Sequence, residues 1–179
     1  MRLLFILLSC TLVMTGCSSP SLVNETAANQ FQSLSKNQQA DYWKAVRRQH
    51  DSAVLEQLGI QVLNNGEEYQ LNIPAKLLFI GTTPMTAEKA HDTYQKIAHL
   101  IDAEPTSSVR ILAYTSTGDN QRDFALTQSW AQTALTGLRE AQLATALLSA
   151  TGKGTCSNYP GKSVKNSHLE IYYRTQQID

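Results

Sequence analysis

The chain has 179 residues, 15 of them basic and 15 acidic, so its formal net charge is zero. A nucleic-acid-binding domain would carry a strongly basic stripe, and we therefore expect no nucleic-acid partner. Once an N-terminal targeting segment is set aside, the remaining length suits one ordinary domain with its own hydrophobic core and a tether.

Residues 1–16 have the pattern of a bacterial signal peptide. The apolar run Leu3–Val13 is too short to cross a bilayer, which takes about 20 residues. It ends in Val13-Met14-Thr15-Gly16-Cys17, which resembles the lipobox of bacterial lipoproteins. The resemblance implies cleavage before Cys17, a covalent lipid on Cys17 and no other cofactor. With Ser18 next, it implies lipid anchoring in the cell outer membrane, facing the periplasm. An ordinary secretory signal near a cysteine is the alternative.

The three cysteines leave no intramolecular disulfide. Cys10 is removed with the signal peptide and Cys17 carries the lipid. Cys156 then stands alone, and we interpret it as a loop thiol, with a bridge to another protein as the alternative. Residues 17–34 are polar and aperiodic, so we expect a flexible tether there.

An N-terminal helix is predicted over residues 35–58. Ser35 and Gln38 fit a capping box, in which each side chain accepts a hydrogen bond from the other residue's free N–H group. Apolar residues recur on one face of this helix: Trp43, Val46, Val54 and Leu58. Packing on its own domain and contact with a neighbouring protein are both open for this helix.

A β-hairpin and a second helix come next. Alternating apolar residues flank Asn64-Asn65-Gly66, and Asn-Gly tolerates the positive φ of a tight hairpin turn. Thr86 is the predicted cap of the helix. Its core-facing stripe is predicted to be Ala90, Tyr94, Ile97, Ala98 and Ile101. His91 and His99 lie off this stripe, two turns apart, and no metal site is predicted.

The central unit runs from Val109 to Leu138. Alternation in 109–114 predicts a strand, and the polar segment Thr115–Asn120 predicts a loop in which Asp119 or Asn120 caps the following helix. Trp130 is expected on the flank of that helix. Its apolar face is predicted to contain Phe124, Ala131, Leu135 and Leu138. In such a unit a ligand usually meets the loop and the helix N-terminus.

The C-terminal part and the central unit together resemble the OmpA-like C-terminal domain. The family's G-x-T-D segment is similar to Ala113-Tyr114-Thr115, and its N-x-x-L-S-x-x-R-A segment is similar to Asp123–Gln132. As in the family, a Gly-x-Gly segment, here Gly152-Lys153-Gly154, precedes a loop and a last strand at 166–173. The resemblance covers residues 59–175. It implies an α/β (α+β) domain over 59–179: a mixed sheet with two main helices on one face, preceded by the hairpin and the N-terminal helix.

The family is known for binding the diaminopimelate of peptidoglycan, with its Asp on the ammonium and its Arg on the carboxylate. These positions fall on Ser116 and Trp130, so both charges are lost. Trp130 has three readings: a cover over the old pocket, an anchor for a partner, or a filler of its own fold. The candidates for substitute pocket contacts are Tyr114, Thr115, Arg122 and Asp123.

The sequence carries no catalytic signature, and we expect no enzyme. The preferred interpretation is a structural scaffold subunit of an envelope assembly. A short lipoprotein with a degenerate OmpA-like site resembles a component of the type IVB (Dot/Icm) secretion core complex, whose other proteins would be its partners. The alternative is an anchor that binds peptidoglycan through altered contacts.

Overall fold

The computed structural model describes residues 32–66, 68–103, 105–144, 147–155 and 167–175. The chain divides into two compact units, Met1–Ala40 and Asp41–Asp179, which are described separately. In the first unit the Ser35 N–H donates to Gln38 Oε1 (2.9 Å) and the Gln38 N–H donates to Ser35 Oγ (3.3 Å). This is the predicted capping box, and it starts helix α2 (Lys36–Gln57). The predictions for Cys17 and Cys156 lie outside the described residues.

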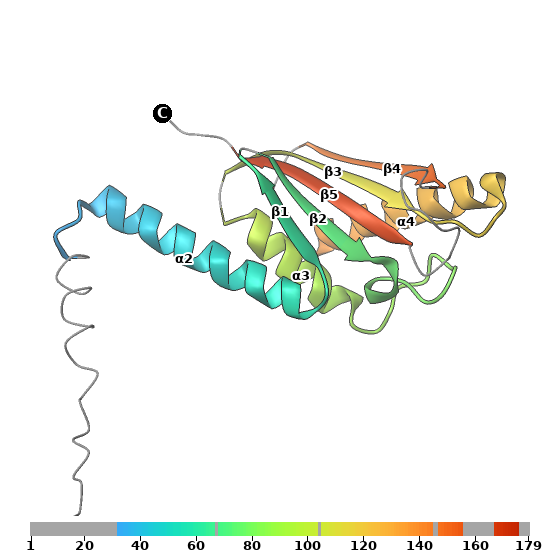
Figure 1. Cartoon of the computed structure of the whole chain (residues 1–179), viewed down its shortest axis with the longest axis horizontal. Helices are drawn as coiled ribbons and strands as arrows, with labels where there is room; N and C mark the ends of the chain where they lie inside the picture. Colours follow the sequence, from blue (N-terminus) through green and yellow to red (C-terminus); the bar gives the residue numbers. More distant parts are fainter. Residues whose placement is uncertain (1–31, 67, 104, 145–146, 156–166, 176–179) are drawn as a thin grey trace, which may run out of the picture. The chain divides into compact units, whose positions relative to one another are not determined.

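The second unit is built on a five-stranded sheet with the order β1-β2-β5-β3-β4 (Figure 1). Its strands are β1 (Gln61–Asn65), β2 (Glu68–Pro74), β3 (Thr106–Tyr114), β4 (Leu148–Gly154) and β5 (His168–Thr175). Strands β3 and β4 are parallel and the other neighbours are antiparallel. The last strand therefore lies in the middle of the sheet, between the hairpin and the central unit. The predicted mixed sheet is confirmed.

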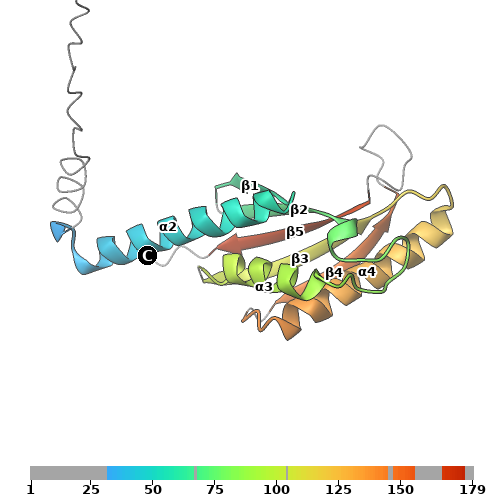
Figure 2. The same ribbon diagram turned by 90° about the horizontal axis from the view of Figure 1, so that it is seen from below.

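Two helices, α3 (Ala90–Ile101) and α4 (Asn120–Glu140), cover one face of this sheet (Figure 2). The strands bury alternate residues against them, as period-two patterns require: Leu71 and Ile73, Val109 and Ile111, Leu169 and Ile171 are 0–1% exposed. In α2, Leu55 belongs to the same core, and the Arg48 guanidinium donates to the Tyr69 hydroxyl (2.6 Å). The predicted helix stripe from Ala90 to Ile101 is buried throughout.

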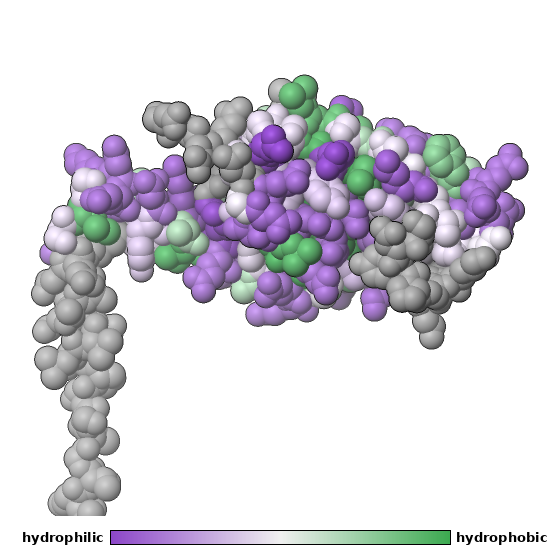
Figure 3. All heavy atoms as spheres, turned by 45° about the horizontal axis from the view of Figure 1, so that its top comes forward, coloured by the Kyte–Doolittle hydropathy of each residue, from purple (hydrophilic) through white to green (hydrophobic). Residues whose placement is uncertain are grey.

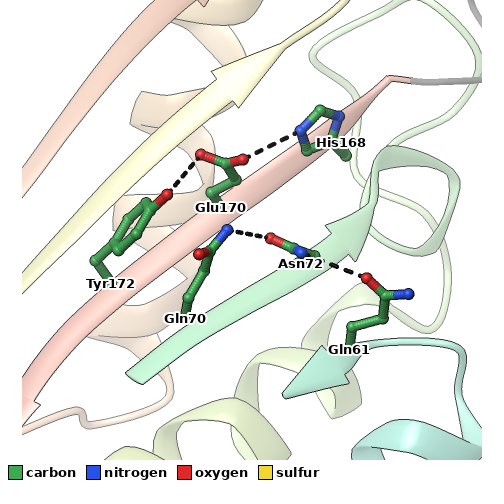
Figure 4. A network of polar contacts seen from close by, with 6 residues as sticks. All are labelled: Gln61, Gln70, Asn72, His168, Glu170 and Tyr172. Atoms are coloured by element: carbon green, nitrogen blue, oxygen red, sulfur yellow. Dashed lines mark hydrogen bonds and ion pairs between the residues drawn. The ribbon is translucent and has the colours of Figure 1, made fainter. Parts of the chain in front are cut away.

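The opposite face of the sheet carries polar side chains from β1, β2 and β5 (Figure 4). The Gln70 amide donates to Asn72 Oδ1 (2.7 Å), and the Tyr172 hydroxyl donates to Glu170 Oε2 (3.1 Å). The surface seen in Figure 3 is mainly hydrophilic with small separate hydrophobic patches. None of the described helices is long and apolar enough to cross a membrane.

Two glycines let α4 approach its neighbours closely. A Cβ on Gly152 in β4 would overlap the backbone of Thr127 and Gln128, and one on Gly137 would overlap the ring of Tyr94 in α3. The space that a side chain would take is thus occupied by the opposing element, and both sites require glycine for packing. The helix lies on β4 nearly backbone to backbone.

Two expectations about the helices are wrong. Thr86 caps no helix, because α3 begins at Ala90 and Thr86 instead forms an isolated antiparallel bridge with Phe79. Phe124 does not belong to the apolar face of α4, since it is 56% exposed. It lies in the first turn, beside Gly154 at the end of β4, where the covering sheet stops.

Replacing Gly152 by alanine should destabilise the second unit by at least about 2 kcal/mol, because the new methyl group overlaps backbone that cannot rotate away. Urea unfolding measures the change. Ser149→Ala on the same strand is the control, and an exposed substitution of this kind should stay within about 0.5 kcal/mol. Equal stability of Gly152→Ala and wild type would contradict the close α4–β4 contact.

Candidate functional site

The candidate site is the β3–α4 loop, residues 115–119, where the family's ligand-binding Asp would stand. Gly118 has a positive φ of 98°, which lets the chain turn back toward α4. Asp119 then caps the helix, its Oδ1 accepting from the N–H groups of Gln121 (3.0 Å) and Arg122 (3.1 Å). The predicted capping by Asp119 is confirmed.

Asp123 is a fully buried carboxylate that orders this loop. Its Oδ1 accepts from the Thr117 N–H (2.9 Å) and from the Thr117 hydroxyl (2.6 Å), and its Oδ2 accepts from the Thr155 hydroxyl (3.2 Å). Burial by itself raises the pKa of Asp123. The hydrogen bonds from Thr117, Thr155 and the Gly118 N–H outweigh it, so the pKa of this carboxyl is lowered.

Thr127 joins the same network from the next turn of α4. Its hydroxyl donates to the Asp123 carbonyl (2.8 Å) and accepts from the Gly154 N–H (2.9 Å). Gly154 in turn accepts from the Thr115 N–H (3.0 Å) and has a positive φ of 67°. In the Gly152-Lys153-Gly154 segment, the first glycine therefore lets α4 pack closely on β4, and the second adopts a positive φ where the strand ends. It is not a phosphate loop.

Ser116, at the position of the family's Asp, is the unsatisfied group of the loop. The residue is half-buried, and its Oγ is buried without a hydrogen-bond partner among the described residues. Its neighbours turn elsewhere: the Thr115 hydroxyl pairs with Ser167 Oγ (2.7 Å), and Tyr114 stacks on His168 with 5.0 Å between ring centroids. The structure thus does not gather Tyr114, Thr115 and Ser116 into one pocket.

Trp130, at the position of the family's Arg, fills the fold. It is 0% exposed and stacks on Phe79, with 5.1 Å between centroids. Its indole N–H donates to the Thr83 carbonyl (2.6 Å), which fixes the loop before α3. Trp130 is buried at its place on the flank of α4, because the segment around Phe79 and Thr83 covers that side of the helix. An anchor for a partner is excluded in this arrangement.

The described residues form no substitute ion pair at the loop. Arg122 is exposed and makes no ion pair with a described residue, and Asp123 is bonded to threonine hydroxyls and backbone. The described part of the chain also contains no group of three His, Cys, Asp or Glu placed to hold a metal ion. Sequence reasoning missed Thr155 and Thr83, since bonds across 32 or 47 residues leave no local pattern. It also missed Thr117, which lies six residues before Asp123.

The burial of Trp130 leads to a prediction on stability. Trp130→Ala should lower the free energy of unfolding by about 3–5 kcal/mol through loss of a buried aromatic. Trp130→Phe keeps the stacking and leaves the Thr83 carbonyl unpaired, at a cost of about 1–3 kcal/mol. Chemical denaturation checks both values. Trp43→Phe, at an exposed tryptophan, is the control and should change stability little. A Trp130→Ala protein as stable as the control would refute the buried indole.

Asp123 supplies a second prediction, on pH. Its folded pKa lies below the unfolded value of about 3.9, so its charge adds stability above that pH, and the contribution is lost as pH falls through the folded pKa. Asp123→Asn should be less stable than wild type at neutral pH, with a gap that closes in acid. Unfolding curves measured against pH check this. A gap that is constant with pH, or no wider than for the exposed Asp41→Asn, would contradict it.

Comparisons with known proteins find relatives in structure alone. No protein-family model matches the chain, and no curated protein does. A putative MotB-like protein of Desulfovibrio vulgaris is 17% identical, with a TM-score of 0.63 over 76% of this chain and 95% of that one. The cell wall anchor of the type VI secretion system of Pseudomonas aeruginosa is 13% identical, with a TM-score of 0.60 over 73% and 98%.

A third neighbour carries the family name itself. The OmpA-like domain of FopA1 from Francisella tularensis is 15% identical, with a TM-score of 0.51 over 65% of this chain and 97% of that one. At these low identities, the structural similarity establishes the fold and does not establish the function. The neighbours give the specific type IVB resemblance no support. The second unit of this chain has the fold of OmpA-like and MotB-like domains.

Proposed function

We propose that this chain is a non-catalytic cell-envelope anchor whose β3–α4 loop binds peptidoglycan through neutral contacts. The fold supports the proposal, because one structural neighbour is itself described as a cell wall anchor. The loop supports it too, since the Asp123 network fixes the backbone of residues 115–119 without any ligand. A preordered loop loses little conformational entropy when it binds.

The observation that carries the proposal is the Oγ of Ser116, which is buried and has no hydrogen-bond partner among the residues that the structure describes. A hydroxyl in that state costs free energy in the free protein, and rotation of this half-buried side chain toward the surface would let a ligand group bond to it and recover that cost. Amide and hydroxyl groups of a peptidoglycan strand are suitable partners. A neutral hydrogen bond contributes about 0.5–1.5 kcal/mol and a charged one about 1.5–3 kcal/mol, so each contact should be weaker than in the family's acid–guanidinium site.

Attachment to the outer membrane would compensate for weak contacts. A lipid on Cys17 and a tether over 17–34 would hold the domain in the periplasm close to the cell wall. Tethering raises the effective concentration of one partner for the other, and many tethered copies bind together. The anchor role therefore requires only modest affinity from each loop.

A scaffold subunit of an envelope assembly, such as the type IVB secretion core complex, is the second candidate. The burial of Trp130 favours this candidate. The position that the resemblance aligns with the family's arginine then has no guanidinium to bind a ligand carboxylate. The same loop that Trp130 fixes also exposes two large apolar side chains, Ile80 (53%) and Met85 (64%). Apolar residues of this kind suit contact with another protein better than contact with a polar glycan.

Sedimentation with purified sacculi tests the anchor. The full chain should bind saturably, and Ser116→Ala should weaken binding by about threefold to tenfold, as one neutral hydrogen bond predicts. Its stability should not fall, since Ser116 Oγ bonds to no described residue. Ser129→Ala removes an exposed helical hydroxyl and is the matched control.

The outcomes separate the two candidates. Absence of retention on sacculi, or equal retention of wild type and Ser116→Ala, would exclude binding through this loop. Isolation of the chain with envelope proteins, followed by loss of those proteins with Met85→Glu, would favour the scaffold. Sacculus binding that survives Met85→Glu would favour the anchor.

A further inference from the structure

A second candidate site lies at the other end of β3, about 26 Å along the strand from Ser116. A hollow of about 450 Å³ opens there on the face of the sheet away from α3 and α4. Outward-facing residues of four adjacent strands line it: Glu68, Ser108, Arg110, Ser149, Tyr172 and Arg174. The volume falls in the range of about 300–1,000 Å³ that small-ligand pockets occupy.

Two arginines, Arg110 and Arg174, line this hollow, and neither has a carboxylate partner in the described part of the chain. Arg110 lies over the Tyr172 ring, 4.8 Å from its centroid, and Arg174 is exposed next to it on β5. Neither forms an ion pair with a described residue. Stacking on an aromatic face holds a guanidinium in place and leaves its N–H groups free to donate.

One carboxylate is available on the same surface. Glu170 is engaged, since it accepts from the Tyr172 hydroxyl (3.1 Å) and lies 3.5 Å from His168 Nε2 (Figure 4). Glu68 is directly opposite Arg174 in the β2–β5 register and makes no ion pair with a described residue. The hollow therefore presents two cations and one anion on neighbouring strands.

We propose that this hollow binds a zwitterionic ligand, an amino acid or a short peptide whose two charged ends both lie in the hollow. The ligand carboxylate would lie on Arg110 and Arg174, and its ammonium group on Glu68. Glu68 would repel a purely anionic ligand, and the two guanidinium groups would repel a purely cationic one. A zwitterion satisfies all three groups, each through a charge-assisted hydrogen bond.

Amide-proton NMR of the full chain, titrated with three related dipeptides, tests this. Zwitterionic Ala-Ala should shift the signals of Ser108, Arg110 and Tyr172 and bind best. N-acetyl-Ala-Ala lacks the ammonium group and Ala-Ala amide lacks the carboxylate, and each should bind at least about tenfold more weakly, because each loses at least one charge-assisted bond. Arg110→Gln should weaken Ala-Ala and N-acetyl-Ala-Ala. Glu68→Gln should weaken Ala-Ala and Ala-Ala amide.

Two controls make the result specific. Lys153→Gln removes an exposed charge of β4 outside the hollow, and Ser116→Ala alters the β3–α4 loop, and neither should change dipeptide binding. No shifts at millimolar dipeptide, or equal affinity for all three dipeptides, would overturn the proposal. Because the two sites are tested with different ligands and variants, failure of either leaves the other standing.

Discussion

The buried carboxylate of Asp123 is the interaction on which the candidate site depends. It joins the loop after β3, the first turn of α4 and the residue after β4 through hydroxyl and N–H donors. A buried charge without such donors would cost several kcal/mol. The threonine hydroxyl groups that donate to this carboxylate therefore stabilise its charge inside the protein. The loop is therefore ordered by the protein itself, before any ligand binds.

Beside this ordered loop, Trp130 is part of the core, at the position that the sequence resemblance aligns with the arginine of OmpA-like domains. Its indole N–H also ties down the Thr83 carbonyl, so the replacement stabilises a neighbouring loop. The loop is thus ordered by the protein itself, and no ion pair forms beside it among the described residues. Arginines without an ion-pair partner in the described part of the chain are found instead on the face of the sheet away from α3 and α4.

Patterns that depend on near neighbours in sequence predicted the structure well. The hairpin, the capping box of α2, the core-facing stripe of α3 and the alternation of β3 and β5 all follow from period and turn chemistry. Errors arose where a distant segment decides the environment. Phe124 fits the apolar face of α4 by spacing but lies past the edge of the sheet, and Trp130 is enclosed by a segment 47 residues away.

The sequence by itself determined the order of the elements, the mixed α/β class and the absence of the family's Asp and Arg, since these are local or are read from identity at a position. Only the tertiary structure decided what replaced them. Whether Trp130 is buried, whether Ser116 is satisfied, and whether Arg110, Arg174 and Glu68 share one hollow depend on contacts between residues far apart in the chain. Such contacts are set by packing of the whole sheet, and no local pattern encodes them.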